Sequence, residues 1–264
     1  MFIVAISRWG RPFLEETAAL APLLGLAPSD ARLVLAGPLP IVVARKEAEE
    51  DTRQLLAALR DRGHGAVACE ADRVISSEAM ISPRTLDFGD ASLLATDPTG
   101  GRHELPYAEI LALIRATRSS TTESSAVTKK QFSLSRTVLT GGLVRSRRVM
   151  AERASIASES EQVLYVIRRS GQEPLLLRER QLQYGSLGNR IARTVAENFA
   201  AVVSLLRSRA PDALHDDRLV TRRRASRDVG ASGPAARRVY SSSNASESDL
   251  AAHLIAISHL QQQL

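Results

Sequence analysis

The sequence predicts an α+β fold: a small α/β sandwich, then a mostly antiparallel β module that a C-terminal helix closes. Residues 1–74 alternate short β-prone runs with helical stretches, and a helix after each of two strands favours such a sandwich. Residues 75–210 carry short runs separated by turn residues and end in one long amphipathic stretch. An apolar fraction of 44% allows a real core, and with only 4% aromatic residues that core must be aliphatic.

The first module is predicted to run strand, helix, helix, strand, helix, strand. The expected elements are Phe2–Ile6, Phe13–Leu24, Asp30–Ala36, Leu39–Val43, Lys46–Arg62 and Ala66–Cys69. Gly25 should stop the first helix, and Ser29 should cap the second. The third helix is the clearest, because acidic residues gather in its early turns and Arg60 and Arg62 stand in its last, as the helix dipole favours.

These residues also carry a family resemblance. Their pattern resembles that of the C-terminal domain of the bacterial ribosomal stalk protein. The features that carry the resemblance are the Leu24-Gly25-Leu26 turn, the helix through Val34, the apolar Ile41–Val43 run, the helix start Lys46–Glu49 and Gly63. That domain shares its fold with the Clp protease adaptor. The resemblance implies this fold and a protein-interaction role. The lysines with which the stalk family contacts translation factors are missing here, so that particular partner is not implied.

The second module is predicted over 75–210. Short strands are expected within Ile81–Phe88 and Leu93–Thr96, a hairpin pairs Gln162–Ile167 with Leu175–Leu177, and a helix covers Ile191–Arg209. In the order of its elements this part resembles a pleckstrin-homology-like domain. The loop at 88–92 lacks the basic cluster of lipid-binding members, so the resemblance does not imply phosphoinositide binding.

A flexible basic insertion is predicted within that module, over 118–158. Ten of the 19 residues from Ser119 to Thr137 are Ser or Thr, and Arg118 to Arg153 holds eight Lys or Arg against two Asp or Glu. A second arginine-rich stretch lies in the tail. The candidate polyanion-binding residues of the two stretches are Lys129, Lys130, Arg145, Arg147, Arg148, Arg222, Arg223 and Arg224.

The tail, 211–264, is predicted to be disordered and basic, with a short terminal helix at 247–260. Ser246 and Asp249 resemble a capping box at the start of that helix. Leu250, Leu254 and Ile257 fall at helical spacing, and an isolated helix of this length is marginal in water. The helix should therefore dock, either on a domain of its own chain or on a partner, and these three residues are candidate partner-binding residues.

Candidate chemistry is sparse. Cys69, the single cysteine, ends an apolar run and is expected to be a buried, inert thiol, and one cysteine cannot form an internal disulfide. His215-Asp216-Asp217 groups metal-ligand types, but adjacent tail residues rarely converge on one ion. His253 and His259 fall on different faces of the expected helix. We therefore expect no metal, no cofactor and no enzyme activity.

Charge and hydropathy leave two function classes open. No apolar run approaches a membrane span and no signal peptide is apparent, so a cytoplasmic protein is expected. The net charge of +6 with 32 arginines can indicate nucleic acid or an anionic membrane surface, or only the codon bias of a GC-rich genome. The sequence favours a non-enzymatic interaction module or adaptor whose partner is unknown, and the alternative is polyanion binding through the arginine-rich segments.

Overall fold

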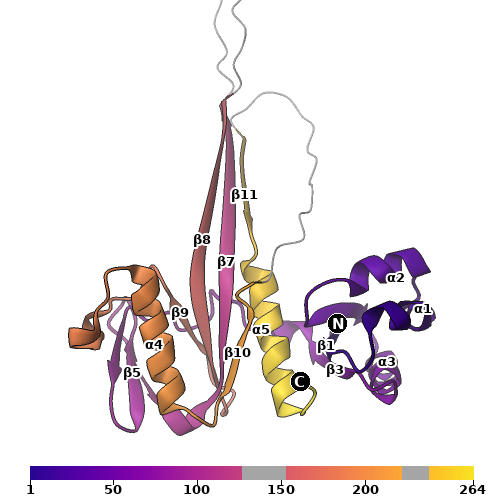
Figure 1. Ribbon diagram of the computed structural model, residues 1–264, viewed down its shortest axis with the longest axis horizontal. Coiled ribbons are helices and arrows are strands. Elements are labelled where there is room, and N and C mark those ends of the chain that lie inside the picture. Colours follow the sequence, from indigo (N-terminus) through magenta and orange to yellow (C-terminus); the bar gives the residue numbers. More distant parts are fainter. Residues whose placement is uncertain (127–152, 222–237) are drawn as a thin grey trace, which may run out of the picture. The chain divides into compact units, whose positions relative to one another are not determined.

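The computed structural model describes residues 1–126, 153–221 and 238–264 (Figure 1). Helices and mainly antiparallel sheets are both present, which confirms the predicted α+β class with a C-terminal helix. The described residues form two compact units: one holds 1–118, 161–221 and 244–264, and the other holds 119–126, 153–160 and 238–243. The boundaries predicted at 74 and 210 therefore lie inside one unit.

The first sheet has strand β1 (Phe2–Arg8) at its centre, with β2 (Ile41–Lys46) and β3 (Gly65–Glu70) antiparallel on either side. Helices α1 (Phe13–Leu24), α2 (Pro28–Leu35) and α3 (Glu49–Asp61) cover one face. The core on that face is aliphatic, as expected, and contains Val4, Ile6, Leu20, Leu35, Leu55, Leu59 and Ala66. The six elements follow the predicted order.

The predicted starts of α2 and α3 are wrong. Helix α3 begins at Glu49 rather than Lys46, because β2 continues to Lys46, which pairs with Phe2 of β1. Helix α2 begins at Pro28, a residue whose fixed φ suits the first helical position, and Ala27 rather than Ser29 precedes it as the cap. Gly25 ends α1 in the left-handed conformation (φ 66°), as predicted.

The second sheet has β7 (Ile110–Ala126) at its centre. Strand β8 (Arg153–Arg168) pairs with β7 on one side and, on its own other side, with β9 (Leu175–Arg178). The predicted hairpin of β8 and β9 is confirmed. On the opposite side of β7 lie β10 (Leu214–Leu219), which is parallel, and β11 (Arg238–Ser243), which is antiparallel.

A third, small antiparallel sheet joins β4 (Thr85–Phe88), β5 (Ser92–Thr96) and β6 (Arg102–Pro106). Helix α4 (Val195–Arg209) shares a core with this sheet and the second sheet through Phe199, Val202 and Leu206. A capping box formed by Thr194 and Glu197 starts α4 at Val195 rather than at the predicted Ile191. Short 3-10 turns lie at Ala71–Arg73, Tyr107–Glu109 and Gly185–Arg190.

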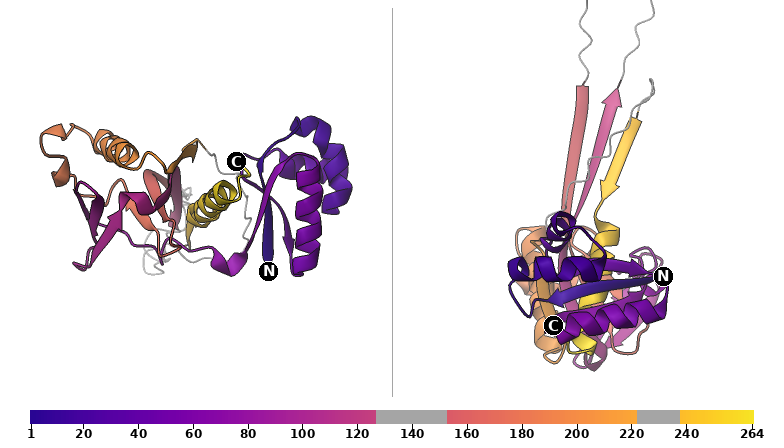
Figure 2. Two further views of the ribbon diagram at one scale, coloured as in Figure 1. Left: turned by 90° about the horizontal axis from the view of Figure 1, so that it is seen from below. Right: turned by 90° about the vertical axis from the view of Figure 1, so that its right-hand side faces the viewer.

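Helix α5 (Ala245–Leu260) is packed between the first and second sheets (Figure 2). Leu254 packs with Ile3 and Val67 on the face of the first sheet that α1–α3 leave uncovered. Ala252 and Ile255 belong to the core of the second sheet. The apolar residues of α5 therefore lie on more than one side of the helix, and sheets cover two of its sides.

The predicted insertion and tail both need correction. Strand β7 runs on to Ala126 and β8 starts at Arg153, so the ends of the insertion are paired backbone; the residues between them lie outside the described part of the chain. In the tail, β10 replaces the expected disorder, because its backbone pairs with β7 and Leu219 is buried. The terminal helix starts at Ala245, and Asn244 rather than Ser246 precedes it.

Candidate functional site

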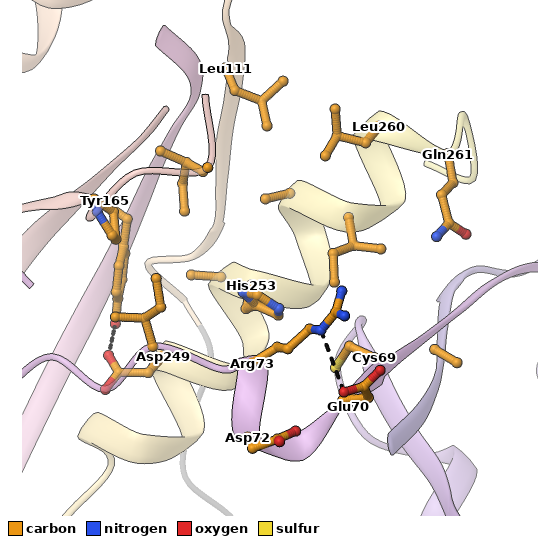
Figure 3. A pocket seen from close by; sticks show the side chains of 18 of the residues that line it. Cys69, Glu70, Asp72, Arg73, Leu111, Tyr165, Asp249, His253, Leu260 and Gln261 are labelled. Atoms are coloured by element: carbon orange, nitrogen blue, oxygen red, sulfur yellow. Dashed lines mark hydrogen bonds and ion pairs between the residues drawn. The ribbon is translucent and has the colours of Figure 1, made fainter. Parts of the chain in front are cut away.

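A groove of about 900 Å³ runs along α5. One side is formed by α3 and β3, and the other by β7, β8 and the turn after β8 (Figure 3). Its volume falls within the roughly 300–1,000 Å³ typical of ligand pockets. We refer to this cavity as the α5 groove.

A stripe of α5 faces the α5 groove. Asp249, His253 and Leu260 belong to it, and their spacing places them along one side of a helix. The lining is mainly apolar. Its apolar members are Phe2, Leu56, Ala68, Ile75, Met80, Leu111, Ile167, Ala252, Ala256, Ile257 and Leu260. Such a surface suits an apolar ligand or an apolar protein segment.

Two ionisable groups in the lining are kept neutral by burial. Burial raises the pKa of the Cys69 thiol to about 11, so the thiol stays protonated at neutral pH and is a poor nucleophile. This agrees with the buried, inert thiol that the sequence predicts. Burial lowers the pKa of His253, because the imidazolium form loses solvation there.

Guanidinium groups in the α5 groove differ in their partners. Arg53 pairs with Glu49 and Glu50, and Arg73 lies 3.5 Å from Glu70. Among the described residues, Arg168 and Arg169 have no carboxylate within 4.0 Å. Arg169 donates to the carbonyls of Ala108 and Asp212. Arg168 donates through Nη1 to Gln172, while its Nε and Nη2 have no partner. The β8 end of the groove therefore has an excess of positive charge.

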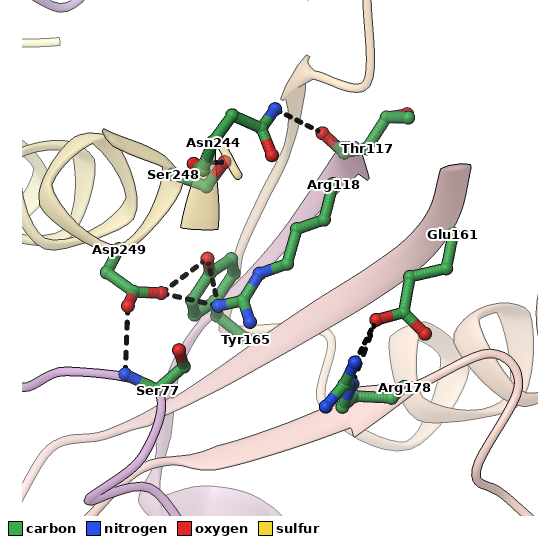
Figure 4. A network of polar contacts seen from close by, with 9 residues as sticks. All are labelled: Ser77, Thr117, Arg118, Glu161, Tyr165, Arg178, Asn244, Ser248 and Asp249. Atoms are coloured by element: carbon green, nitrogen blue, oxygen red, sulfur yellow. Dashed lines mark hydrogen bonds and ion pairs between the residues drawn. The ribbon is translucent and has the colours of Figure 1, made fainter. Parts of the chain in front are cut away.

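A buried ion pair lies at the other end of the stripe (Figure 4). Arg118 of β7 donates through Nη2 to Asp249 Oδ1 at 2.5 Å and to the Tyr165 hydroxyl at 2.8 Å. The Tyr165 hydroxyl in turn donates to Asp249 Oδ1 at 2.9 Å. The second carboxylate oxygen accepts the Ser77 N–H at 2.8 Å. These bonds connect α5, β7, β8 and the segment before β4, and so fix α5 against the β7–β8 side of the groove.

A second polar cluster lies inside the first module, away from the α5 groove. Glu16 of α1 accepts from Arg62 at 2.7 Å and lies 3.2 Å from His64 Nε2. The Gly10 N–H donates to His64 Nδ1, so in the neutral ring Nε2 carries the proton that faces Glu16. The Arg62 hydrogen bond is the main cause of the lowered pKa of Glu16. The cluster joins the turn after β1 to the turn before β3, which is a structural role.

The structure corrects the candidate partner-binding residues. Leu254 is only 1% exposed and packs in the core of the first sheet, with Leu250 and Ile257 half-buried against the same core. The helix has docked on its own chain, which was the other possibility the sequence left open. Ile257 also contributes to the α5 groove.

The candidate polyanion-binding residues are not tested. Lys129, Lys130, Arg145, Arg147 and Arg148 lie outside the described residues, and so do Arg222, Arg223 and Arg224. Their role stays a prediction.

Most of the α5 groove could not be found from the sequence. Its lining comes from α3, β3, β7, β8 and α5, which are far apart along the chain. One signal was available: the apolar residues of Ala245–Leu260 are spread around the helix rather than confined to one face, which indicates a helix enclosed by other elements. The sequence pattern does not say which elements enclose it.

Metal and membrane features can be stated for the described residues alone. Within 1–126, 153–221 and 238–264, no three His, Cys, Asp or Glu side chains are arranged to hold a metal ion. In the same residues no single helix has the length and apolar character of a membrane span, although α1 and α2, bent by 115°, reach both when taken together.

Comparison with known proteins gives no relative. No family model matches the chain, and neither a curated protein nor a solved structure matches it. The stalk-protein and pleckstrin-homology-like resemblances therefore stay predictions.

Proposed function

We propose that this protein is a non-enzymatic interaction module that holds a segment of a protein partner in the α5 groove. The observation that carries the proposal is the groove itself, which has a volume of about 900 Å³ and a largely apolar lining. A contiguous apolar hollow of this size is typical of binding sites. The Cys69 thiol stays protonated and is a poor nucleophile, which favours binding over nucleophilic chemistry there.

The resemblance of residues 1–74 to the stalk and Clp adaptor fold also supports a protein partner. The terminal helix no longer supports it, because α5 is buried in its own chain. The proposed binding surface is therefore the groove beside the helix, and not the apolar face of the helix.

A retention experiment tests this proposal. The tagged full chain is incubated with its native lysate, with and without nuclease, and washed at low and high salt. Leu260→Glu places a charge in the α5 groove at a side chain that is 63% exposed, and Leu33→Glu is the matched control on α2, where the leucine is 78% exposed. We expect one stoichiometric protein to remain with the wild type and with Leu33→Glu, and to be lost with Leu260→Glu.

Other outcomes assign the function elsewhere. Loss with Leu33→Glu alone would place the interaction on α2 and contradict the groove. Loss of all retained material on nuclease or high-salt treatment would favour the alternative proposal, in which the arginine-rich segments bind nucleic acid or an anionic membrane surface. The thermal midpoint of each variant is compared with the wild type, so that unfolding is recognised.

A further inference from the structure

Strand β3 is an edge strand inside the α5 groove. The first sheet has the order β2-β1-β3, so β3 has a neighbour on one side only. Its residues Ala68, Cys69 and Glu70 line the groove. An edge strand presents backbone N–H and C=O groups that another strand can pair with.

The register shows which backbone groups of β3 point outward. Ala71 N–H donates to the Met1 carbonyl, and the antiparallel register then pairs Ile3 with Cys69 and Val4 with Ala68. Because hydrogen-bonded and non-hydrogen-bonded pairs alternate, Cys69 bonds to β1, whereas Ala68 and Glu70 direct their N–H groups away from it.

At one end of this edge the outward backbone carbonyl already has a hydrogen-bond donor. The Ala66 carbonyl, which also points outward, accepts from Arg60 Nε at 3.0 Å, and Arg60 Nη2 donates to Gln261 at 2.7 Å. Among the described residues, no hydrogen bond occupies the outward N–H and C=O of Ala68 or the outward N–H of Glu70. Ala68 is half-buried rather than fully exposed, so its backbone groups lie where apolar side chains exclude part of the water.

The two sides of β3 also define what an added residue would meet. The Ala68 side chain packs towards the α3 face, and Cys69 towards the α5 face. A strand added to β3 would therefore direct alternate side chains towards Thr52 and Leu56 on one face and towards Ile257 on the other. Arg168 and Arg169, which lack carboxylate partners, line the same cavity and favour an acidic residue.

We infer that the α5 groove binds an extended, apolar segment of a partner protein that carries a carboxylate, and that this segment pairs with β3 as a fourth strand. The inference rests on the proposed function and specifies its binding mode. A symmetric pairing of two β3 edges does not fit, because each edge lies in its own groove beside half-buried Ala68. Strand addition of this kind takes affinity from backbone bonds and selectivity from alternate side chains.

Synthetic peptides test the mode directly on the full chain. The probe is a library of acetylated, C-terminally amidated heptapeptides in which valine alternates with randomised residues and the last residue is Asp. Two matched libraries carry N-methyl groups on the odd or on the even backbone nitrogens. In an added strand, whether parallel or antiparallel to β3, only every second N–H faces β3. Methylation of the nitrogens that face β3 should therefore weaken peptide binding at least tenfold, and methylation of the other set should change binding little.

Two further measurements locate the contact and its charge. Saturating peptide should slow amide exchange of Ala68 and Glu70 at least tenfold, while Leu33, on the remote α2 helix, keeps its rate. An otherwise identical library ending in Asn should bind the wild type about threefold more weakly than the Asp library, and Arg168→Gln should abolish that preference.

Each remaining outcome overturns strand addition, and the retention experiment separately decides the proposed function. Peptides that bind, are lost with Leu260→Glu and tolerate both methylated libraries would occupy the groove through side chains alone. Equal loss with both methylated libraries would indicate a helical or otherwise compact ligand. Absence of any binding peptide contradicts strand addition, because backbone hydrogen bonds do not depend on the randomised residues. Concentration-dependent self-association through β3 would replace the partner with a second copy.

Discussion

Cys69 illustrates how a single residue is controlled by its surroundings. The residue lies next to the last position of β3, is 7% exposed and belongs to the core that α5 completes. Loss of solvation there disfavours the thiolate and raises the pKa to about 11. A pattern of residues alone could indicate burial of this thiol, but the helix that buries it comes from the opposite end of the chain.

The thiol of Cys69 should therefore react slowly in the folded protein. At pH 8 the thiolate fraction with a pKa near 11 is about a hundredfold below that of an unperturbed cysteine, so alkylation by iodoacetamide should be at least that much slower than in urea. Because the thiolate is the reactive form, the folded-state rate should rise with pH without a plateau up to pH 10. The measurement is labelling followed by mass spectrometry, and a plateau near pH 9 would show an ordinary thiol.

At the scale of elements, α5 shows that the side of a helix on which a leucine lies determines the role of that leucine. Its Leu254 completes the core of the first sheet, whereas Leu260, its last residue, is 63% exposed and faces the α5 groove. The same residue type on one helix therefore has two roles, core packing and groove lining, according to which side of the helix it occupies.

Truncation of these two leucines should separate the roles. Leu254→Ala removes buried methyl groups and leaves a cavity, so it should lower the free energy of unfolding by about 2–5 kcal/mol. Leu260→Ala should change it by no more than about 0.5 kcal/mol. Urea unfolding of both variants checks this, and similar losses in the two would contradict the separation into a core leucine and a groove leucine.

At the scale of the molecule, one buried ion pair connects parts that are distant in the chain. Arg118 and Asp249 are 131 positions apart, and with Tyr165 and Ser77 they connect two strands of the second sheet, α5 and the segment before β4. Burial raises the pKa of Tyr165 well above its ordinary range, which keeps its hydroxyl able to donate. Each ion is desolvated, so the arrangement depends on both partners being present.

Removing one partner of this pair should cost far more than removing both. Asp249→Leu leaves the Arg118 guanidinium buried without its counter-ion and should destabilise the chain by about 3–5 kcal/mol. In the double variant Arg118→Met with Asp249→Leu, no unpaired charge remains, and most of that loss should be recovered. A double-mutant cycle from urea unfolding measures the coupling, and simple additivity of the single variants would show that the pair is not coupled in the folded state.

Local patterns in the sequence determined much of the framework. The order of the six elements in residues 1–74, the β8–β9 hairpin and the stretch that forms α4 all follow from hydrophobic periodicity and turn residues, which act within a few positions. The buried state of Cys69 followed in the same way. Helix ends were less predictable, since the α3 start depends on how far β2 pairs with β1.

Only the tertiary structure decided where α5 lies, that β10 is a strand, and that β3 and α5 border a common groove. Strand β10 is polar at His215 to Arg218 and forms because its backbone pairs in parallel with β7, more than a hundred residues earlier. The α5 groove likewise exists because distant segments meet around one helix. Local periodicity specifies that a helix or strand is apolar on a given side, and packing between distant segments determines what covers that side.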